Sequence, residues 1–452
     1  MGKQWGSRAL LGAMLTAISL AQATAQPASA PPDLDQSQIK AEYGRAFQAM
    51  MADVGNLDKT FHFAQVAILA GDYEGAIGSL ERMLLVNPSL PRVRLELGVL
   101  YYRLNSYQVA RNYLVSALET PNVPPEVAER VKIFLDEIDQ KLSPHRLNGS
   151  IYAGLRYETN ANAGPDSNNI QVFGLPARLA DQFTSQEDWT AFGMASLVHV
   201  YDFMTQDSTS WDSLASLYVS RHQEHTEVDL TVLSLSTGPR FKLSLADVDN
   251  VSVRPYAVLD WVRLADDTYY VAPGGGLTLS KGFDDGSTAD LSLEARRRAF
   301  NDTSDHPFNS DQTGWEYVAR LQGTHLLNRS WLVHGGITLF DRTAEQSWEA
   351  NREYAANLGI SRTYQPWYAS EVPWVTTLTG TVAFTEYDAP DPTVNPTEAR
   401  EDLDLRLTLI QTVPLDREWA LVATVSHSIR DSSLPNFEHD NTIATLGATW
   451  RF

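Results

Sequence analysis

The chain has 452 residues, which is too long for one ordinary domain, so at least two structural units are expected. The net charge of −21 disfavours nucleic acid as a partner, because binding it relies on lysine and arginine to neutralise phosphates. The sequence has no cysteine, which excludes disulfides, thiolate metal sites, a cysteine nucleophile and a lipid-modified cysteine. The fold must therefore depend on packing and hydrogen bonds.

Residues 1–25 predict a secretory signal peptide. Lys3 and Arg8 form a short basic segment, residues 9–21 are mostly apolar, and small residues at 23–25 offer a cleavage site. The apolar run is short for a membrane-spanning helix, and the proline-bearing segment 26–36 predicts a linker. No later stretch is apolar and long enough to cross a bilayer as a helix. We therefore expect an exported protein.

Residues 37–142 predict an all-α domain of tetratricopeptide repeats. Apolar residues recur at helical spacing, and the segment 72–84 returns 34 residues later as 106–118. Two copies are few for an independent solenoid, so helices at 37–52 and 125–142 are expected to cap its ends. Small residues that would let paired helices approach closely are Gly71, Ala76, Gly98, Ala110 and Ala117.

A stack of such helix pairs normally presents a groove lined by the first helix of each pair. We expect this groove to dock a peptide or a protein. The alternative for each position is an ordinary solvated helix residue. The predicted groove residues are Phe61, Gln65, Ile68, Arg92, Leu95, Tyr102 and Arg103.

Residues 146–452 predict an antiparallel β domain. Helical periodicity disappears there, and short segments alternate polar and apolar residues between clusters of turn residues. In the segment 402–409, for example, one face is all leucine and the other is polar. About fourteen strands are predicted, the first near 149–158 and the last near 440–452. Polar segments at 159–187, 302–311 and 389–397 predict external loops, and 326–328 predicts a tight turn.

Alternation alone does not separate a soluble sandwich from a transmembrane barrel whose apolar face meets lipid. Three observations favour the barrel. The last strand places Trp450 and Phe452 on one apolar face, similar to the signal by which the barrel-assembly machinery recognises outer-membrane barrels. Ten of the eleven tryptophans lie in this domain, many near predicted strand ends. An exported chain with no helical span must also pair every backbone group that lies in lipid.

The sequence therefore predicts a Gram-negative outer-membrane barrel, in contact with outer-membrane lipid, and a periplasmic N-terminal domain. Polar residues on the other strand face would then line the lumen. Opposed charges there could stabilise the barrel by pairing across it, or they could line a conduit or gate, and both interpretations stay open. The predicted lumen residues are Arg156, Arg254, Asp260, Glu294, Arg296, Arg298, Asp402, Asp404 and Arg406.

The chain resembles the surface lipoprotein assembly modulator family over nearly all of its predicted mature length. The resemblance is most specific in the repeat segments 94–98 and 105–107, the bridging segment 123–135 and the first strand with its turn, 149–162. It implies a periplasmic tetratricopeptide domain followed by a fourteen-stranded outer-membrane barrel. It also implies a translocon that helps lipoproteins, or in some relatives secreted proteins, to reach the cell surface, with the helical domain receiving the client.

The sequence carries no catalytic motif that we recognise, such as G-x-S-x-G, H-E-x-x-H or a phosphate-binding loop, so neither enzyme activity nor a cofactor is expected. His222 and His225 have a spacing that suits a metal, but a polar loop is the better interpretation, and no metal site is predicted. Two other functions remain open: an exopolysaccharide-export porin and a simple diffusion porin, each with the repeats as a scaffold.

Overall fold

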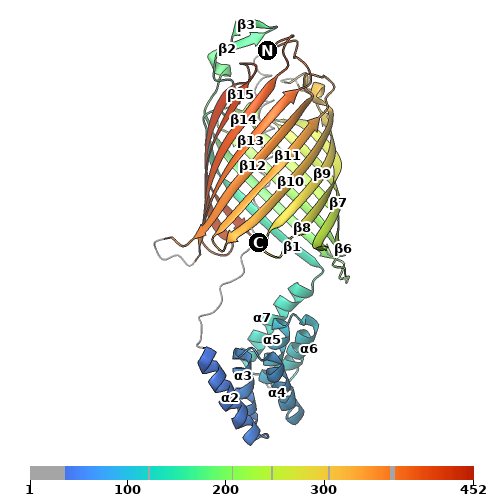
Figure 1. The fold of residues 1–452 in the computed structure, drawn as a ribbon, viewed down its shortest axis with the longest axis vertical. Coiled ribbons are helices and arrows are strands. Elements are labelled where there is room, and N and C mark those ends of the chain that lie inside the picture. Colours follow the sequence, from blue (N-terminus) through green and yellow to red (C-terminus); the bar gives the residue numbers. More distant parts are fainter. Residues whose placement is uncertain (1–35, 121–122, 206, 246–247, 304–305, 367–371) are drawn as a thin grey trace. The chain divides into compact units, whose positions relative to one another are not determined.

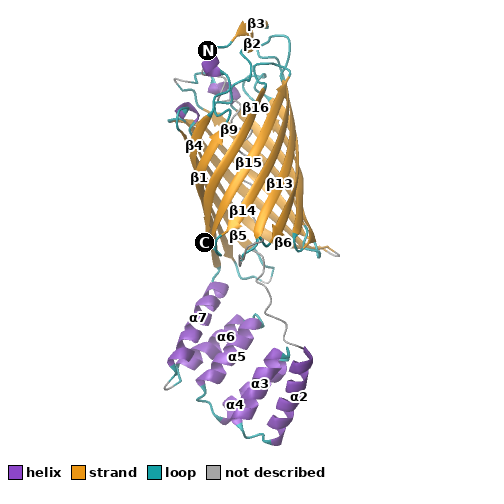
Figure 2. Ribbon diagram, turned by 90° about the vertical axis from the view of Figure 1, so that its left-hand side faces the viewer, coloured by secondary structure: helices purple, strands orange, loops and turns teal. Residues whose placement is uncertain are grey.

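The computed structural model describes residues 36–120, 123–205, 207–245, 248–303, 306–366 and 372–452. They form a helical unit and a separate all-β unit that begins at His145 (Figures 1 and 2). The predicted signal peptide and nearly all of the predicted linker lie outside the described residues, as does Trp367.

The described part of the helical unit contains six helices arranged as two helix pairs and two capping helices. The helices are α2 (Gln36–Ala52), α3 (Leu57–Leu69), α4 (Tyr73–Val86), α5 (Pro91–Arg103), α6 (Tyr107–Leu118) and α7 (Pro125–Leu142). One apolar core joins α2 to the first pair, and a second joins α7 to the α5–α6 pair. The predicted repeat fold with its two capping helices is confirmed. No helix among the described residues is long and apolar enough to span a bilayer.

The repeat is visible in the turns as well as in the packing. Gly71 and Asn105 end the first helix of each pair with positive φ angles of 81° and 58°. This left-handed conformation suits glycine and is tolerated by asparagine, which explains why these two residue types occupy equivalent places. Gly98 allows a close helix approach, because a Cβ atom there would lie 2.6 Å from Cγ of Leu114.

The β unit is a closed antiparallel barrel, in which the described residues form fourteen strands. Each strand pairs with its neighbours in sequence, and β1 also pairs with β16. The strands are β1 (His145–Glu158), β4 (Asp188–Asp202), β5 (Ser210–His222), β6 (Leu230–Leu245), β7 (Val248–Leu264), β8 (Asp267–Gly282), β9 (Thr288–Phe300), β10 (Gly314–Asn328), β11 (Trp331–Arg342), β12 (Asn351–Tyr364), β13 (Trp374–Tyr387), β14 (Glu401–Pro414), β15 (Trp419–Ser432) and β16 (His439–Arg451). The predicted barrel is confirmed.

The two ends of the barrel differ in their connections. β1 begins and β16 ends at one end, which we call the terminal end; the strand connections there are mostly short. The opposite end, the loop end, carries the segments 159–187 and 388–400, and a small hairpin of β2 (Asn169–Val172) and β3 (Leu175–Arg178) extends from it (Figure 1). One predicted turn is wrong: residues 326–328 belong to β10, because their ladder with β11 continues to Asn328.

The two faces of the wall differ in polarity, as β14 demonstrates. Leu403, Leu405, Leu407 and Leu409 are 38–56% exposed on the outer face, whereas Asp402 on the other face is 2% exposed. Tryptophans mark the strand ends, among them Trp189, Trp211, Trp315, Trp331, Trp374, Trp419 and Trp450.

Two helical glycines should respond in opposite ways to alanine. In Gly98→Ala the new Cβ meets Leu114 and its helix pair must shift, so we expect the helical unit to lose ~1–3 kcal/mol. Gly78 lies within α4 with nothing within 4 Å of its Cβ position, so Gly78→Ala should add up to ~1 kcal/mol through helix propensity.

The measurement is thermal loss of helical circular dichroism in the full chain, with Gly78→Ala as the matched control. Equal melting temperatures in the two variants would contradict the close approach at Gly98.

Candidate functional site

All nine predicted lumen side chains lie on the strand face opposite the exposed leucines, and none of them is exposed. Hydrogen bonds and ion pairs join most of them into clusters near the loop end. Their strands are β1 for Arg156, β7 for Arg254 and Asp260, β9 for Glu294, Arg296 and Arg298, and β14 for Asp402, Asp404 and Arg406.

Arg296 is the centre of one cluster. Its guanidinium forms ion pairs with Asp260 from β7 and with Glu294 from its own strand. The Tyr256 hydroxyl donates a hydrogen bond of 2.9 Å to Glu294. Both carboxylates therefore share the same arginine as their ion-pair partner, as buried charged groups require.

A second cluster continues around the wall through β9, β10, β11 and β12. Arg342 donates hydrogen bonds of 2.9 Å to both Glu316 and Glu353, and Arg298 lies 4.0 Å from Glu316. Arg342, Glu316 and Glu353 were not among the predicted lumen residues. Each of them alternates with outward-facing residues along its strand, and that alternation was the signal that could have identified them.

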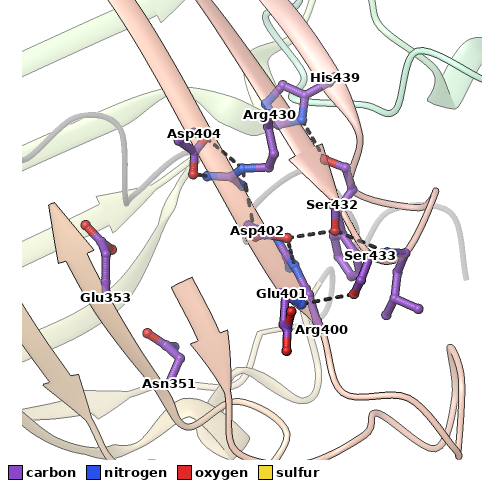
Figure 3. A network of polar contacts seen from close by, with 12 residues as sticks. Asn351, Glu353, Arg400, Glu401, Asp402, Asp404, Arg430, Ser432, Ser433 and His439 are labelled. Carbon is purple, nitrogen blue, oxygen red and sulfur yellow. Dashed lines mark hydrogen bonds and ion pairs between the residues drawn. The ribbon is translucent and has the colours of Figure 1, made fainter. Parts of the chain in front are cut away.

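A third cluster lies at the start of β14 (Figure 3). Arg430 of β15 donates two hydrogen bonds of 2.9 Å to Asp404, and Arg400 forms an ion pair of 2.6 Å with Asp402. The Arg400 guanidinium also lies 3.5 Å from the ring centroid of Phe437, a cation–π contact. Arg400 and Arg430 were missed as well. Planar, two-pronged guanidinium contacts of this kind fix geometry more tightly than single charges do.

Arg156 and Arg254 lie at different heights in the barrel. Arg156 forms an ion pair of 2.6 Å with Glu158 and donates a hydrogen bond of 3.0 Å to the Tyr218 hydroxyl, close to the loop end. Arg254 lies nearer the terminal end, where it donates to the carbonyl of Asp212 and to Ser236. The structure therefore does not bring Arg254 together with the clusters at the loop end.

A cavity of about 120 Å³ lies among the second and third clusters. Breaking a buried ion pair by removing one partner costs ~3–5 kcal/mol, so these paired charges hold the side chains around the cavity in place. The side chains around the cavity combine paired charges with aromatic rings, among them Arg298, Arg342, Arg400, Arg430, Glu316, Glu353, Tyr269, Tyr270 and Phe437.

The β2–β3 hairpin, residues 169–178, is tied to two other loops at the loop end; we call it the lid. Gln171 is its main attachment: its backbone N–H and carbonyl both bond to the Asn436 amide side chain, and its side chain accepts from Asn395 at 2.9 Å. Val394 and Leu434 in these loops are only 2% and 1% exposed. The loops are therefore packed as a layer with its own small core.

On the helical unit, the predicted groove residues fall into two sets. Phe61 and Arg92 are brought together, because the Arg92 guanidinium lies 5.7 Å from the Phe61 ring centroid. Gln65 and Arg103 are exposed, and Ile68 is half-buried. Phe61, Gln65, Ile68 and Arg92 lie on α3 and α5, the first helices of the two pairs, as expected for such a groove. We call Phe61 and Arg92 the Phe–Arg patch.

The prediction for Leu95 is wrong. Leu95 is 1% exposed and belongs to the core that joins α5 and α6 to α7, because the capping helix packs against that part of α5. Tyr102 is half-buried and contacts Phe134 edge-on at 5.5 Å. A hydrogen bond to Glu137, together with burial, raises the pKa of Tyr102 to about 12, so it remains a neutral donor.

Phe452 lies at the seam where the barrel closes. Its backbone N–H and carbonyl exchange hydrogen bonds of 3.0 and 2.9 Å with Gly149, and a Cβ atom at Gly149 would lie 2.3 Å from the Phe452 ring. Trp450 stacks on Trp419 with 6.1 Å between ring centroids. The Phe452 contact thus lies at the seam between β1 and β16, whereas the Trp450–Trp419 stack joins β16 to β15.

The two histidines with metal-like spacing are engaged separately. Nδ1 of His222 lies 3.1 Å from Asp229, and Nδ1 of His225 lies 3.1 Å from Glu227. In the part of the chain that the structure describes, no group of three or more His, Asp or Glu side chains is placed to hold a metal ion.

Comparisons with known proteins return only distant structural likenesses. No family model and no curated protein matches the chain. A type III secretion chaperone from Yersinia enterocolitica, in complex with a translocator peptide, is 18% identical over 23% of this chain and 82% of its own, with a TM-score of 0.22. An anion-selective porin from Comamonas acidovorans is 10% identical over 68% of this chain and 99% of its own, with a TM-score of 0.33. An outer-membrane channel from Pseudomonas putida F1 is 11% identical over 68% and 95%, with a TM-score of 0.35.

Arg342→Met removes the cation shared by Glu316 and Glu353. Because two carboxylates are left without their main hydrogen-bond donor, we expect the barrel to lose ~3–5 kcal/mol of stability. The control is Arg329→Met in the exposed turn after β10, where a surface substitution should change stability by less than ~0.5 kcal/mol. Urea unfolding followed by tryptophan fluorescence measures both, and identical transitions would contradict the role of Arg342.

Proposed function

We propose that this chain is an outer-membrane translocon that delivers lipoproteins, or related secreted proteins, to the cell surface, and that its helical unit docks the client from the periplasm. The proposal rests on one observation: a single chain contains both a closed barrel and a helical repeat unit. The barrel has an apolar outer wall, and repeat units of this kind commonly bind peptides. The role is one of binding and transport, without catalysis or a cofactor.

The wall of the barrel supports membrane insertion. Outward leucines along the strands suit contact with lipid, and tryptophans at the strand ends suit the two interfaces. In outer-membrane barrels the short turns face the periplasm and the long loops face outward. This orientation would place the terminal end in the periplasm. The helical unit comes directly before β1 in the chain, and β1 begins at the terminal end. The barrel-assembly machinery would be the partner during insertion.

The helical unit supports a polypeptide client. The Phe–Arg patch combines an aromatic ring with a guanidinium, two groups that are over-represented among residues dominating protein interfaces. Near this patch, Gln65 and Arg103 are exposed and polar, Ile68 is half-buried, and Leu69 at the end of α3 is exposed and apolar. An extended segment with apolar and acidic residues fits this surface best.

The side chains at the loop end weigh against a simple diffusion porin. Paired charges and aromatic rings surround a cavity of about 120 Å³ there, whereas a porin keeps an open aqueous channel. A translocon instead needs a barrier that holds when no client is engaged. An exopolysaccharide exporter would need the same barrier, and the client-binding experiment below separates it from a protein translocon.

The double substitution Phe61→Ala with Arg92→Glu should reduce client delivery while the barrel still assembles. It removes the aromatic ring and reverses the charge of the Phe–Arg patch. Loss of such an interface centre typically costs 2 kcal/mol or more, about 30-fold in affinity. The readout is the set of lipoproteins digested when protease is added to intact cells, with barrel assembly followed by heat-modifiable migration.

The matched control is Gln108→Ala with Arg111→Glu on α6. Arg111 is exposed and pairs with Asp139 at 3.2 Å, an exposed contact that contributes little stability. Unchanged lipoprotein display in the Phe61/Arg92 variant would overturn the docking role, and equal loss in both variants would show a general effect of charge.

Tying the lid to its neighbouring loop should block export. The sequence has no cysteine, so Gln171→Cys with Asn436→Cys places the only two thiols where the two loops already bond to each other. A cleavable thiol crosslinker should stop lipoprotein display in intact cells, and cleavage should restore it.

The matched pair is Asn169→Cys with Arg178→Cys, which are register partners within the lid itself and do not join it to another loop. Export that continues through a crosslinked 171–436 pair would mean that the lid need not move.

A further inference from the structure

The outer wall of the barrel carries a polar row at the terminal end of strands β11 to β14. Its members are outward register partners on successive strands: Trp331, Arg362, Thr376 and Gln411. The next outward row toward the middle of the wall is apolar throughout: Val333, Ile360, Leu378 and Leu409. The change from a polar to an apolar surface therefore falls between two adjacent rows, as expected where a barrel wall enters lipid.

Arg362 is the one charged member of the polar row, and it is exposed. Its guanidinium lies 5.4 Å from the ring centroid of Trp331 and 5.5 Å from that of Tyr364. The neighbouring polar groups satisfy one another, because the hydroxyls of Thr376 and Tyr364 donate to Oε1 of Gln411 at 2.6 and 3.3 Å. Among the residues that the structure describes, none accepts a hydrogen bond from the Arg362 guanidinium or forms an ion pair with it. Its N–H donors are therefore available to a ligand.

This unpaired cation belongs to the terminal end alone. At the loop end the same side of the wall carries outward carboxylates on β11, β13, β14 and β15: Asp341, Glu386, Glu401 and Asp431. Arg352 at that end is already shared by Asp341 and Asp388, each 3.9 Å away. Arg329, exposed in the turn before β11, adds a second cation at the terminal end. An anion is therefore favoured at the terminal end of these strands and disfavoured at the loop end.

We propose that Arg362, flanked by Trp331 and Tyr364, binds the phosphate of an anionic glycerophospholipid whose acyl chains lie along the apolar row. The inference rests on the proposed function, which turns the terminal end to the periplasm, because glycerophospholipids form the periplasmic leaflet of an outer membrane. A guanidinium presents paired N–H donors that match the geometry of phosphate oxygens. A headgroup with an ammonium would bring another cation toward Arg362 and Arg329, and the polar row has no carboxylate to receive it. The charges therefore select for a headgroup that is negative overall.

The test is native mass spectrometry of the full chain released from vesicles of phosphatidylglycerol and phosphatidylethanolamine in equal amounts. The unmodified protein should retain phosphatidylglycerol preferentially. Arg362→Gln keeps a polar side chain but removes the charge, so it should lower the retained ratio of phosphatidylglycerol to phosphatidylethanolamine about 5-fold. The matched control is Arg352→Gln, which removes an outward arginine from the loop end of the same strand and should leave that ratio unchanged.

Equal losses in Arg362→Gln and Arg352→Gln would show a general effect of charge and would overturn the site. Equal retention of the two lipids by the unmodified protein would leave Trp331, Arg362 and Tyr364 as an ordinary interfacial belt. Displacement of the retained lipid by millimolar glycerol phosphate would assign Arg362 to soluble phosphates instead. Failure of the unmodified protein to insert into the vesicles would contradict the membrane location in the proposed function, whereas insertion without a lipid preference contradicts only the site.

Discussion

The structure depends on the pairing of β1 with both β4 and β16. This double pairing leaves no strand edge open along the ring. An unpaired backbone group in hydrocarbon costs several kcal/mol, so a sheet that enters lipid must close on itself. Once the ring is closed, the alternation of side chains divides each strand into an outward row and an inward row. The alternation of outward leucines and inward carboxylates along β14 is a consequence of this closure.

Closure of the ring also determines which inward-facing charged side chains become partners. Arginines and carboxylates on neighbouring strands are brought within reach of one another near the loop end, where they share partners instead of facing bulk water. A charge buried in this way is tolerated only when it is paired and hydrogen-bonded. Arg342 therefore stabilises the wall by joining Glu316 of β10 to Glu353 of β12 across its own strand.

Features that depend on neighbouring residues along the chain could be predicted from the sequence. Features that depend on contacts between segments far apart in the chain could not. Alternation within each strand was enough to find all fourteen strands and the inward side of β14, and the 34-residue repeat was enough to place the helix pairs. Leu95 was misassigned because the helical period of α5 does not reveal that α7 packs against it. Alternation could have placed Arg342 on the inward face, but its pairing with Glu316 and Glu353, like that of Arg430 with Asp404, joins different strands, and strand register is set by the whole ring. The contacts of Gln171 join segments more than 200 residues apart, and no local pattern encodes them.

Under the proposed translocon function, the strengths of these contacts determine the order in which the loop end would open. The lid is attached by neutral hydrogen bonds that the Asn395 and Asn436 amides donate to Gln171 and by two backbone bonds to the 388–400 segment, each worth ~0.5–1.5 kcal/mol net. The arginine–carboxylate pairs beneath it cost ~3–5 kcal/mol each to break, because a buried charge is left behind. Water that enters after the lid lifts lowers this second cost, since it solvates the exposed charges. Opening is therefore expected to begin at the lid, and the ion pairs separate only after it has moved.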